Sequence, residues 1–309
     1  MSDALDVPTV AIRFALYANL MVLFGLSACR LYAAALAKPT GPTARVIRRS
    51  ILILAITALL LSVVGLIALC AAMAGMPIMQ VDRETVDMVL TQTPIGAAWI
   101  VRMAALLAIA ATSIVRRWNS VVTLLCAGIA LATLAWTGHG AAGEGSAGWI
   151  QLAADIAHLL AAGVWIGALA LFAVVLGRPV RRMTDADVAA SHAALDRFAL
   201  VGTLVVAVLI ATGLISSAML VGIENVATLP STLYGQLLMI KLMLFAAMLV
   251  LAAANRWRLT PALGRCTDLS DRLRAVTALR RSLAAETAAA LVILGLVAWL
   301  GTLSPPLAA

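Results

Sequence analysis

Charged residues are scarce in this chain. Asp, Glu, Lys and Arg make up 12% of its 309 residues, whereas soluble domains carry about 25%. A soluble domain of this length would need a polar surface, yet 63% of the residues are hydrophobic and they come in long uninterrupted runs. The composition therefore excludes a soluble enzyme and predicts a protein whose surface mostly faces lipid.

Several familiar motifs are missing as well. The four cysteines have no C-x-x-C spacing, so neither a zinc site nor a disulfide framework is predicted. Residues 1–10 contain no Lys or Arg, which favours a retained first helix over a cleaved signal peptide. The glycines of residues 138–148 lack the Lys-Ser/Thr of a phosphate-binding loop. Because no nucleophile and base can be paired either, we do not expect an enzyme.

Long apolar runs are what the chain has instead. A helix that crosses a hydrocarbon core of about 30 Å needs roughly 20 apolar residues, whereas a barrel would need alternating segments of about ten. Eight runs fit the helical template, at residues 10–36, 50–74, 95–115, 119–137, 149–177, 198–221, 235–254 and 283–301. The sequence therefore predicts an all-α transmembrane bundle of about eight helices, forming a single domain over residues 1–309.

The basic residues alternate along these runs. The connections after the first, third, fifth and seventh runs hold most of the 22 Lys and Arg residues, whereas the opposite connections and both tails hold only Arg83. Loops rich in Lys and Arg face the cytoplasm. With an even number of helices, both termini are predicted to be periplasmic. The net charge of +8 is interpreted as this topology signal, and no nucleic-acid partner is expected.

Two cytoplasmic connections have features of their own. In residues 255–282, apolar side chains recur at helix-like spacing beside arginines, which fits either a short helix on the anionic leaflet or a solvated basic loop. These side chains are Leu269, Leu273, Val276 and Leu279. His192 lies among acidic and basic residues in 178–197, and we interpret it as a solvated loop residue.

Ionisable residues inside the predicted membrane helices are few. Such groups are costly in lipid and usually face the bundle interior or an aqueous cavity, so they are candidates for function. Arg13 and Arg102 lie near the periplasmic ends of their helices, where we expect their long side chains to snorkel to the interface. The other candidates are Asp155, His158, Lys241 and Glu286, with His139 just outside the fourth run.

The sharpest functional signal lies between the fourth and fifth runs. His139 stands between two glycines, and a set of residues in the fifth run shares one helix face. That set is Gln151, Asp155, His158, Ala162 and Trp165. Asp155 and His158 are one turn apart, and a carboxylate beside an imidazole is the arrangement found behind metal-binding histidines. These residues predict a metal site, with a buried His–Asp pair that only joins helices as the alternative.

Methionines gather at the end of the second run. Met73, Met76 and Met79 recur every third residue after Cys70, on the same predicted face of the membrane as His139. Thioether sulfur is a soft ligand suited to Cu(I), and imidazole suits copper in either oxidation state. Methionine also fills irregular gaps in packed cores. The run therefore fits copper binding or simple packing.

Several of these residues, in this order, resemble the copper resistance protein D family, CopD, whose members are bacterial inner-membrane proteins of about eight helices. The resemblance is best over residues 136–303. It rests on Gly138-His139, Asp155-x-x-His158-Leu159-Leu160-Ala161-Ala162-x-x-Trp165-x-Gly167, Thr212-Gly213, Tyr234-Gly235-Gln236-Leu237-Leu238-x-x-Lys241, Asn255-Arg256, Leu279-Arg280-Arg281 and Leu300-Gly301-Thr302-Leu303-Ser304-Pro305-Pro306. Ala168 stands where a second glycine would be expected, so close packing there is in doubt.

The resemblance implies a copper transport and homeostasis protein. Such proteins are similar to partners of a periplasmic copper-binding protein, CopC, and are thought to move copper across the inner membrane towards the cytoplasm. His139 and His158 are carried over as metal contacts, with four supporting positions: Asp155, Trp165, Tyr234 and Lys241. Lys241 is expected either to pair with Asp155 or Glu286, or to snorkel to the periplasm.

Two other functions fit the same residues. His139 and His158 could ligate haem b or support copper redox chemistry in a membrane redox protein, although two helix-ending histidines are few for haem. A copper sensor or scaffold that carries no flux is the other alternative. A Soret band would identify haem, and copper flux would separate a transporter from a sensor.

Overall fold

The bundle is entirely helical in the part of the chain that the computed structural model describes. These residues are 6–29, 32–33, 42–114, 119–137, 145–177, 179, 183–222, 226–265 and 268–303. Within them, eight helical spans are long and apolar enough to cross a membrane. This finding confirms the predicted all-α transmembrane fold and its eight helices.

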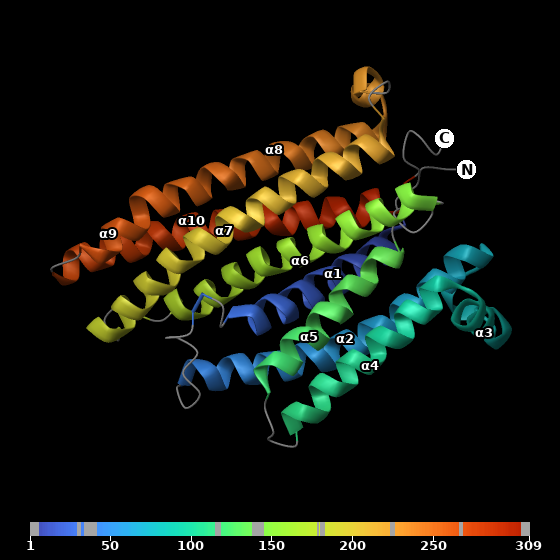
Figure 1. The fold of residues 1–309 in the computed structure, drawn as a ribbon, viewed down its shortest axis with the longest axis horizontal. Coiled ribbons are helices and arrows are strands. Elements are labelled where there is room, and N and C mark those ends of the chain that lie inside the picture. The colour runs from blue at the N-terminus through green and yellow to red at the C-terminus, as the bar shows by residue number, and fades with distance from the viewer. Residues whose placement is uncertain are drawn as a thin grey trace.

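The eight spans form an elongated bundle (Figure 1). Their helices are α1 (Val7–Ala28), α2 (Pro42–Ala74), α4 (Pro94–Ile114), α5 (Ser120–Ala132), α6 (Gly145–Leu176), α7 (Asp185–Leu220), α8 (Leu233–Ala254) and α10 (Leu269–Leu300). A 3-10 turn, η3 (Thr133–Thr137), lengthens α5, and a π-helical turn (Asn255–Leu259) followed by α9 (Thr260–Gly264) lengthens α8. Another 3-10 helix, η6 (Val226–Ser231), precedes α8.

Helix α1 lies inside the bundle and crosses α6 at very close range. The four-residue spacing of Gly163 and Gly167 predicts such an approach. A Cβ atom built on Gly25 would lie 2.2 Å from the carbonyl oxygen of Gly163 and 2.5 Å from Cα of Gly167. Only glycine lets the two backbones meet here. Ala168 is 1% exposed beside this crossing, so an alanine is accommodated at that position.

Two helices begin much earlier than the apolar runs predict. Helix α7 starts at Asp185 after a capping box made by Thr184 and Asp187, and α10 starts at Leu269 after the N-cap residue Asp268. The helix-like spacing of residues 269–279 is confirmed, but these residues form the first turns of α10, so both a separate helix on the leaflet and a solvated loop were wrong. The reason is tertiary packing, since Val276 and Leu279 of these turns are completely buried in the core.

His192 corrects the interpretation of residues 178–197 in the same way. It lies in α7, partly buried, and a Cβ atom on Gly264 of α9 would come within 2.6 Å of its Nε2 atom. His192 therefore packs against α9 and does not lie in a solvated loop.

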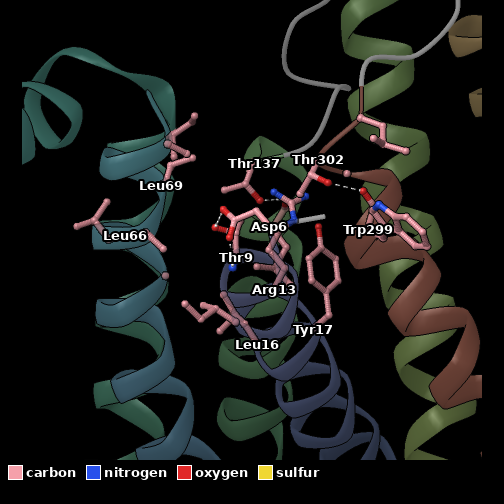
Figure 2. Close-up of a pocket in the computed structure, with 18 of the residues that line it drawn as sticks. Asp6, Thr9, Arg13, Leu16, Tyr17, Leu66, Leu69, Thr137, Trp299 and Thr302 are labelled. Atoms are coloured by element: carbon pink, nitrogen blue, oxygen red, sulfur yellow. Dashed lines mark hydrogen bonds between the residues drawn. The ribbon is translucent and has the colours of Figure 1, made fainter. Parts of the chain in front are cut away.

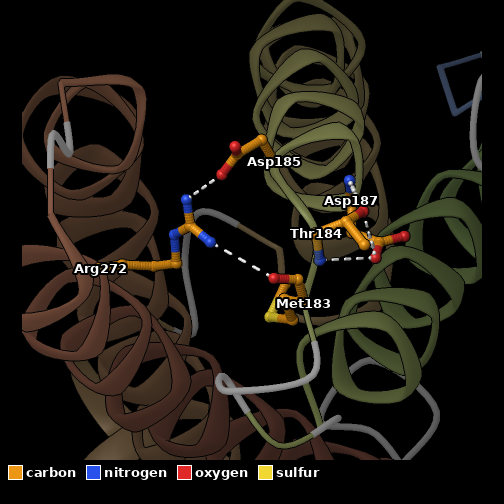
Figure 3. A network of polar contacts seen from close by, with 5 residues as sticks. All are labelled: Met183, Thr184, Asp185, Asp187 and Arg272. Carbon is orange, nitrogen blue, oxygen red and sulfur yellow. Dashed lines mark hydrogen bonds and ion pairs between the residues drawn. The ribbon is translucent and has the colours of Figure 1, made fainter.

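Polar contacts hold this basic end of the bundle together. Arg272 of α10 forms an ion pair with Asp185 at the start of α7, and its Nη1 donates to the carbonyl oxygen of Met183 (Figure 3). Arg280 Nε donates to the carbonyl oxygen of Leu176 at 2.6 Å, at the end of α6. Some of the arginines that predict topology thus also fasten α10 to α6 and α7.

The opposite end carries a short amphipathic helix, α3 (Arg83–Gln92). Helix α2 ends at Ala74, and the next residue, Gly75, has a φ of 65°, the left-handed conformation that caps helices. Helix α3 then packs back on the bundle through Val89, which forms a small buried cluster with Leu66 and Cys70 of α2. Cys70 is therefore a packing residue, closed off from solvent.

Candidate functional site

A cavity of about 670 Å³, lined by both polar and apolar side chains, opens at the same end of the bundle as α3. Helices α1, α2, α4, α8 and α10 and the turn η3 all contribute to its lining. Asp6, before α1, and Leu303, after α10, both line it, so the two ends of the described chain meet at this end. Figure 2 shows Arg13 and Tyr17 of α1 beside Thr137 and Thr302. We call this space the outer cavity.

Two arginines line the outer cavity. Arg102 of α4 is only 3% exposed, and its Nε donates to Thr133 Oγ1 at 2.9 Å. The expectation that Arg102 snorkels to the interface was therefore wrong, because the helix buries the guanidinium within the bundle. Arg13 is partly buried, and its Nε atom is buried with no hydrogen-bond partner. Gly301 leaves room for this guanidinium, since a Cβ atom there would lie 2.3 Å from Arg13 Nη2.

Deeper in the bundle, two polar residues of α6 bond to two hydroxyl residues of α7. His158 Nδ1 lies 2.8 Å from Thr212 Oγ1, and Ser216 Oγ donates to Asp155 Oδ1 at 3.0 Å. Each pair of residues is about one helical turn apart, so the two helices match in register. Asp155 and His158 of the predicted stripe thus face α7, where these hydroxyls bond to the carboxylate and to the imidazole.

The Thr212 hydroxyl also fixes which nitrogen of His158 carries the proton. Thr212 Oγ1 donates to the carbonyl oxygen of Val208 at 2.6 Å, and a hydroxyl has only one proton to give. Oγ1 must therefore accept from Nδ1–H of His158. The geometry therefore places a proton on Nδ1, and in the neutral form of this imidazole the lone pair would lie on Nε2.

Lys241 and Tyr234 of α8 complete this group. Lys241 interacts electrostatically with both Asp155 and His158, and Tyr234 interacts with Asp155. Of the partners expected for Lys241, the structure favours Asp155. We call Asp155, His158, Thr212, Ser216 and Lys241 the inner cluster. Tyr234 joins the two regions, because it also lines the outer cavity.

Glu286 of α10 lies in a separate buried contact. It is 3% exposed, it accepts a hydrogen bond from the Asn255 amide, and it interacts with the side chain of Trp165. Trp165 is two turns beyond His158 on α6 and is itself 5% exposed. The Trp165–Glu286 contact joins α6 to α10, and the supporting role of Trp165 at a metal site stays a prediction.

The predicted soft ligands are more exposed. Met73 is 57% exposed and Met79 is 94% exposed, while Met76 is partly buried. All three follow Cys70 at the end of the bundle that holds the outer cavity. His139 lies outside the described residues, two positions after Thr137, which lines the outer cavity. Among the described residues, no three His, Cys, Asp or Glu side chains are grouped as a metal site.

Comparison with known proteins identifies the family of this chain. A family model for the copper resistance protein D-like N-terminal domain matches residues 1–149, and one for copper resistance protein D matches residues 192–300. Copper resistance protein D of Pseudomonas syringae pv. tomato is 40% identical over 308 residues, which cover 98% of this chain and 99% of the relative. The chain belongs to the copper resistance protein D family.

Two other relatives of this chain are less similar to it. Inner membrane protein YebZ of Escherichia coli K12 is 26% identical over 304 residues, covering 96% of this chain and 98% of the relative. Copper transport protein CutJ of Bacillus subtilis is 29% identical over 235 residues, covering 72% of this chain and 39% of the relative. No solved structure matches the chain. The eight membrane-length helices fit a multi-pass inner-membrane protein.

The match to the family reaches beyond residues 136–303, into the first four membrane helices. The residues that sequence reasoning missed are Ser216, as a partner of Asp155, and Thr133, as the partner of Arg102. One signal was present for the first. Thr212 and Ser216 are hydroxyl residues four positions apart in an apolar helix, which places them on one face.

Proposed function

We propose that this protein accepts copper at its periplasmic face and moves it towards the cytoplasm. One observation carries the proposal. In an apolar bundle of a copper resistance family, Tyr234 connects the outer cavity to the inner cluster, where the imidazole of His158 has its Nε2 lone pair free of the Thr212 contact. Polar side chains thus extend from the outer cavity into the bundle as far as the imidazole of His158, and imidazole is a ligand suited to copper.

The orientation in this proposal comes from the basic residues. Arg272 and Arg280 lie at the end of the bundle opposite the outer cavity, and loops rich in arginine face the cytoplasm. The outer cavity then opens to the periplasm, and both termini are periplasmic. A periplasmic copper-binding protein of the CopC type would deliver its copper at this opening.

The proposed copper contacts follow the depth of the residues. Met73, Met76 and Met79, at the rim, would take copper from the donor protein by ligand exchange, since thioethers bind Cu(I) without holding it in a closed site. His139, which follows Thr137 of the cavity lining by two positions in the sequence, would receive it, and His158 would bind it within the membrane. Asp155 compensates the positive charge of Lys241, so that the lysine does not repel the ion.

The proposed protein is a transporter and no enzyme, and copper is its cargo. No phosphate-binding motif accompanies the bundle, so movement would follow a gradient or the movement of another ion. Reconstitution tests this directly. Purified protein in liposomes loaded with a copper-chelating dye should take up copper faster than empty liposomes. His139→Ala and His158→Ala should lose this uptake.

The matched control is His192→Ala, because His192 is the third histidine of the chain and packs at the opposite end of the bundle. It should retain wild-type uptake. Wild-type uptake in both His139→Ala and His158→Ala would refute the assigned contacts. Equal copper uptake by empty liposomes and by liposomes that contain the protein would refute transport. A copper sensor or scaffold would then be the remaining function. A Soret band in the purified protein would instead support a haem-binding redox protein.

A further inference from the structure

We propose that the outer cavity binds an oxyanion, a carboxylate or phosphate group, between Arg102 and Arg13. Arg102 is a permanent cation, and its side chain is buried, with 3% of the residue exposed. Its Nε bonds to the neutral hydroxyl of Thr133, and that hydroxyl in turn donates to the carbonyl oxygen of Ala130 at 2.6 Å. Thr133 therefore supplies a dipole and no negative charge.

The part of the chain that the structure describes gives neither arginine a counter-ion. Ion pairs among the described residues include those of Arg83 with Asp87, Arg272 with Asp185, and Arg274 with Asp271, and neither Arg13 nor Arg102 takes part in these. A buried charge with no opposite charge is strongly unfavourable, and more so within a membrane. Arginine cannot relieve that cost by losing its proton. An anion in the adjoining cavity would relieve it.

Arg13 supplies a second cation to the same space. It lines the outer cavity with Arg102, and its buried Nε has no hydrogen-bond partner. The acidic residue in the described lining is Asp6, whose carboxylate accepts from the hydroxyl of Thr9 at 2.6 Å and from its N–H at 3.4 Å. The described lining therefore has an excess of positive charge.

The cavity also has the shape and chemistry for such a ligand. Its volume of about 670 Å³ admits a polyatomic anion, and the side chains of Tyr17, Thr137 and Tyr234 line it with the two guanidinium groups. Guanidinium groups recognise carboxylate and phosphate through paired parallel hydrogen bonds. If copper enters here, as proposed above, an anion bound to the arginines would offset their repulsion. The ion could then enter as a complex with a carboxylate ligand.

Binding is tested without copper, so that the result is independent of transport. Purified protein in neutral detergent is titrated with citrate or inorganic phosphate, and thermal unfolding and calorimetric binding are recorded. The wild type should bind one of them and gain several degrees in melting temperature. Arg102→Gln should lose at least ten-fold in affinity, with Arg102→Lys in between. Arg83→Gln is the matched control, since Arg83 is an exposed arginine at the same end, and it should bind as the wild type does.

The sign of the stability change without anion separates this proposal from a structural role. Arg102→Gln should melt at or above the wild-type temperature, because it removes an uncompensated charge. A lower melting temperature together with unchanged anion binding overturns the proposal. Stabilisation by phosphatidylglycerol nanodiscs alone, lost in Arg102→Gln, assigns the phosphate to a lipid headgroup. If no anion or anionic lipid binds the wild type, the proposal is wrong.

Discussion

The outer cavity and the inner cluster handle charge in opposite ways. In the outer cavity, the described lining brings two arginines together with Asp6, whose carboxylate is bonded to Thr9. In the inner cluster, Asp155 balances Lys241, and hydroxyls of α7 hold the carboxylate and the imidazole of His158. We therefore expect the entrance to repel a cation unless an anion accompanies it, whereas the proposed function has the inner cluster bind the cation through the imidazole of His158.

The largest loss of stability is expected at the α1–α6 crossing, because α1 lines the outer cavity and α6 carries part of the inner cluster. Gly25→Val should abolish folded protein, because the added side chain would overlap the backbone of Gly163 and Gly167. The overpacking cost exceeds the usual range of about 1–3 kcal/mol, since backbone cannot move aside. Gel filtration and thermal unfolding in detergent would measure it. Gly295→Ala, where a Cβ meets no atom within 4 Å, should behave as wild type.

Wild-type elution and melting of Gly25→Val would contradict the close crossing. The outer cavity and the inner cluster would then not both depend on the packing of α1 against α6.

Next in size is the charge pair of the inner cluster. Asp155→Asn should destabilise the protein by about 1–3 kcal/mol, because it leaves Lys241 without its opposite charge. The double variant Asp155→Asn/Lys241→Met should recover most of that loss. Unfolding in detergent of the four proteins of the cycle measures the coupling. Arg102→Gln supplies the contrast, since removing that cation should cost nothing. Additive effects of Asp155→Asn and Lys241→Met would show that the two residues do not interact.

A smaller effect is expected from the residue that positions His158. Thr212→Val removes the acceptor of Nδ1–H, which should cost about 1 kcal/mol in stability. It should also weaken copper binding roughly ten- to a hundred-fold, because the partner of a metal-binding histidine fixes its tautomer. Competition with a copper chelator measures this. Thr212→Ser should restore the affinity, and failure of that rescue would count against the hydroxyl's role.

The smallest effect is expected at the rim. Met73→Leu/Met79→Leu should change stability by no more than about 0.5 kcal/mol, because both side chains are exposed. Uptake should slow only at low copper, where capture limits the rate. Loss of uptake at saturating copper would instead place these methionines on the route itself.

The sequence predicted the membrane helices and the stripe on α6, because apolar run length and three- or four-residue spacing are local properties. It could not predict where α7 and α10 begin. Their first turns are charged, and burial of Val276 and Leu279 depends on packing between distant segments. The same limit explains Arg102, since nothing near it in the sequence reveals that Thr133, 31 residues away, will bond to it.

The inner cluster shows the same division. Its α6 residues were identified from spacing and from the family resemblance. Ser216 was not, because pairing between α6 and α7 depends on how the two helices are rotated towards each other. The hydroxyl spacing on α7 indicates one face, and only the fold shows which helix that face meets.

We propose that the outer cavity captures copper and that the inner cluster passes it through the membrane. The dependence of initial uptake rate on copper concentration in proteoliposomes tests it most directly, with the wild type, His139→Ala and His158→Ala compared at equal protein density. We predict that the initial uptake rate of His158→Ala stays close to that of empty liposomes at every copper concentration. A wild-type maximal rate for His158→Ala at saturating copper would contradict it.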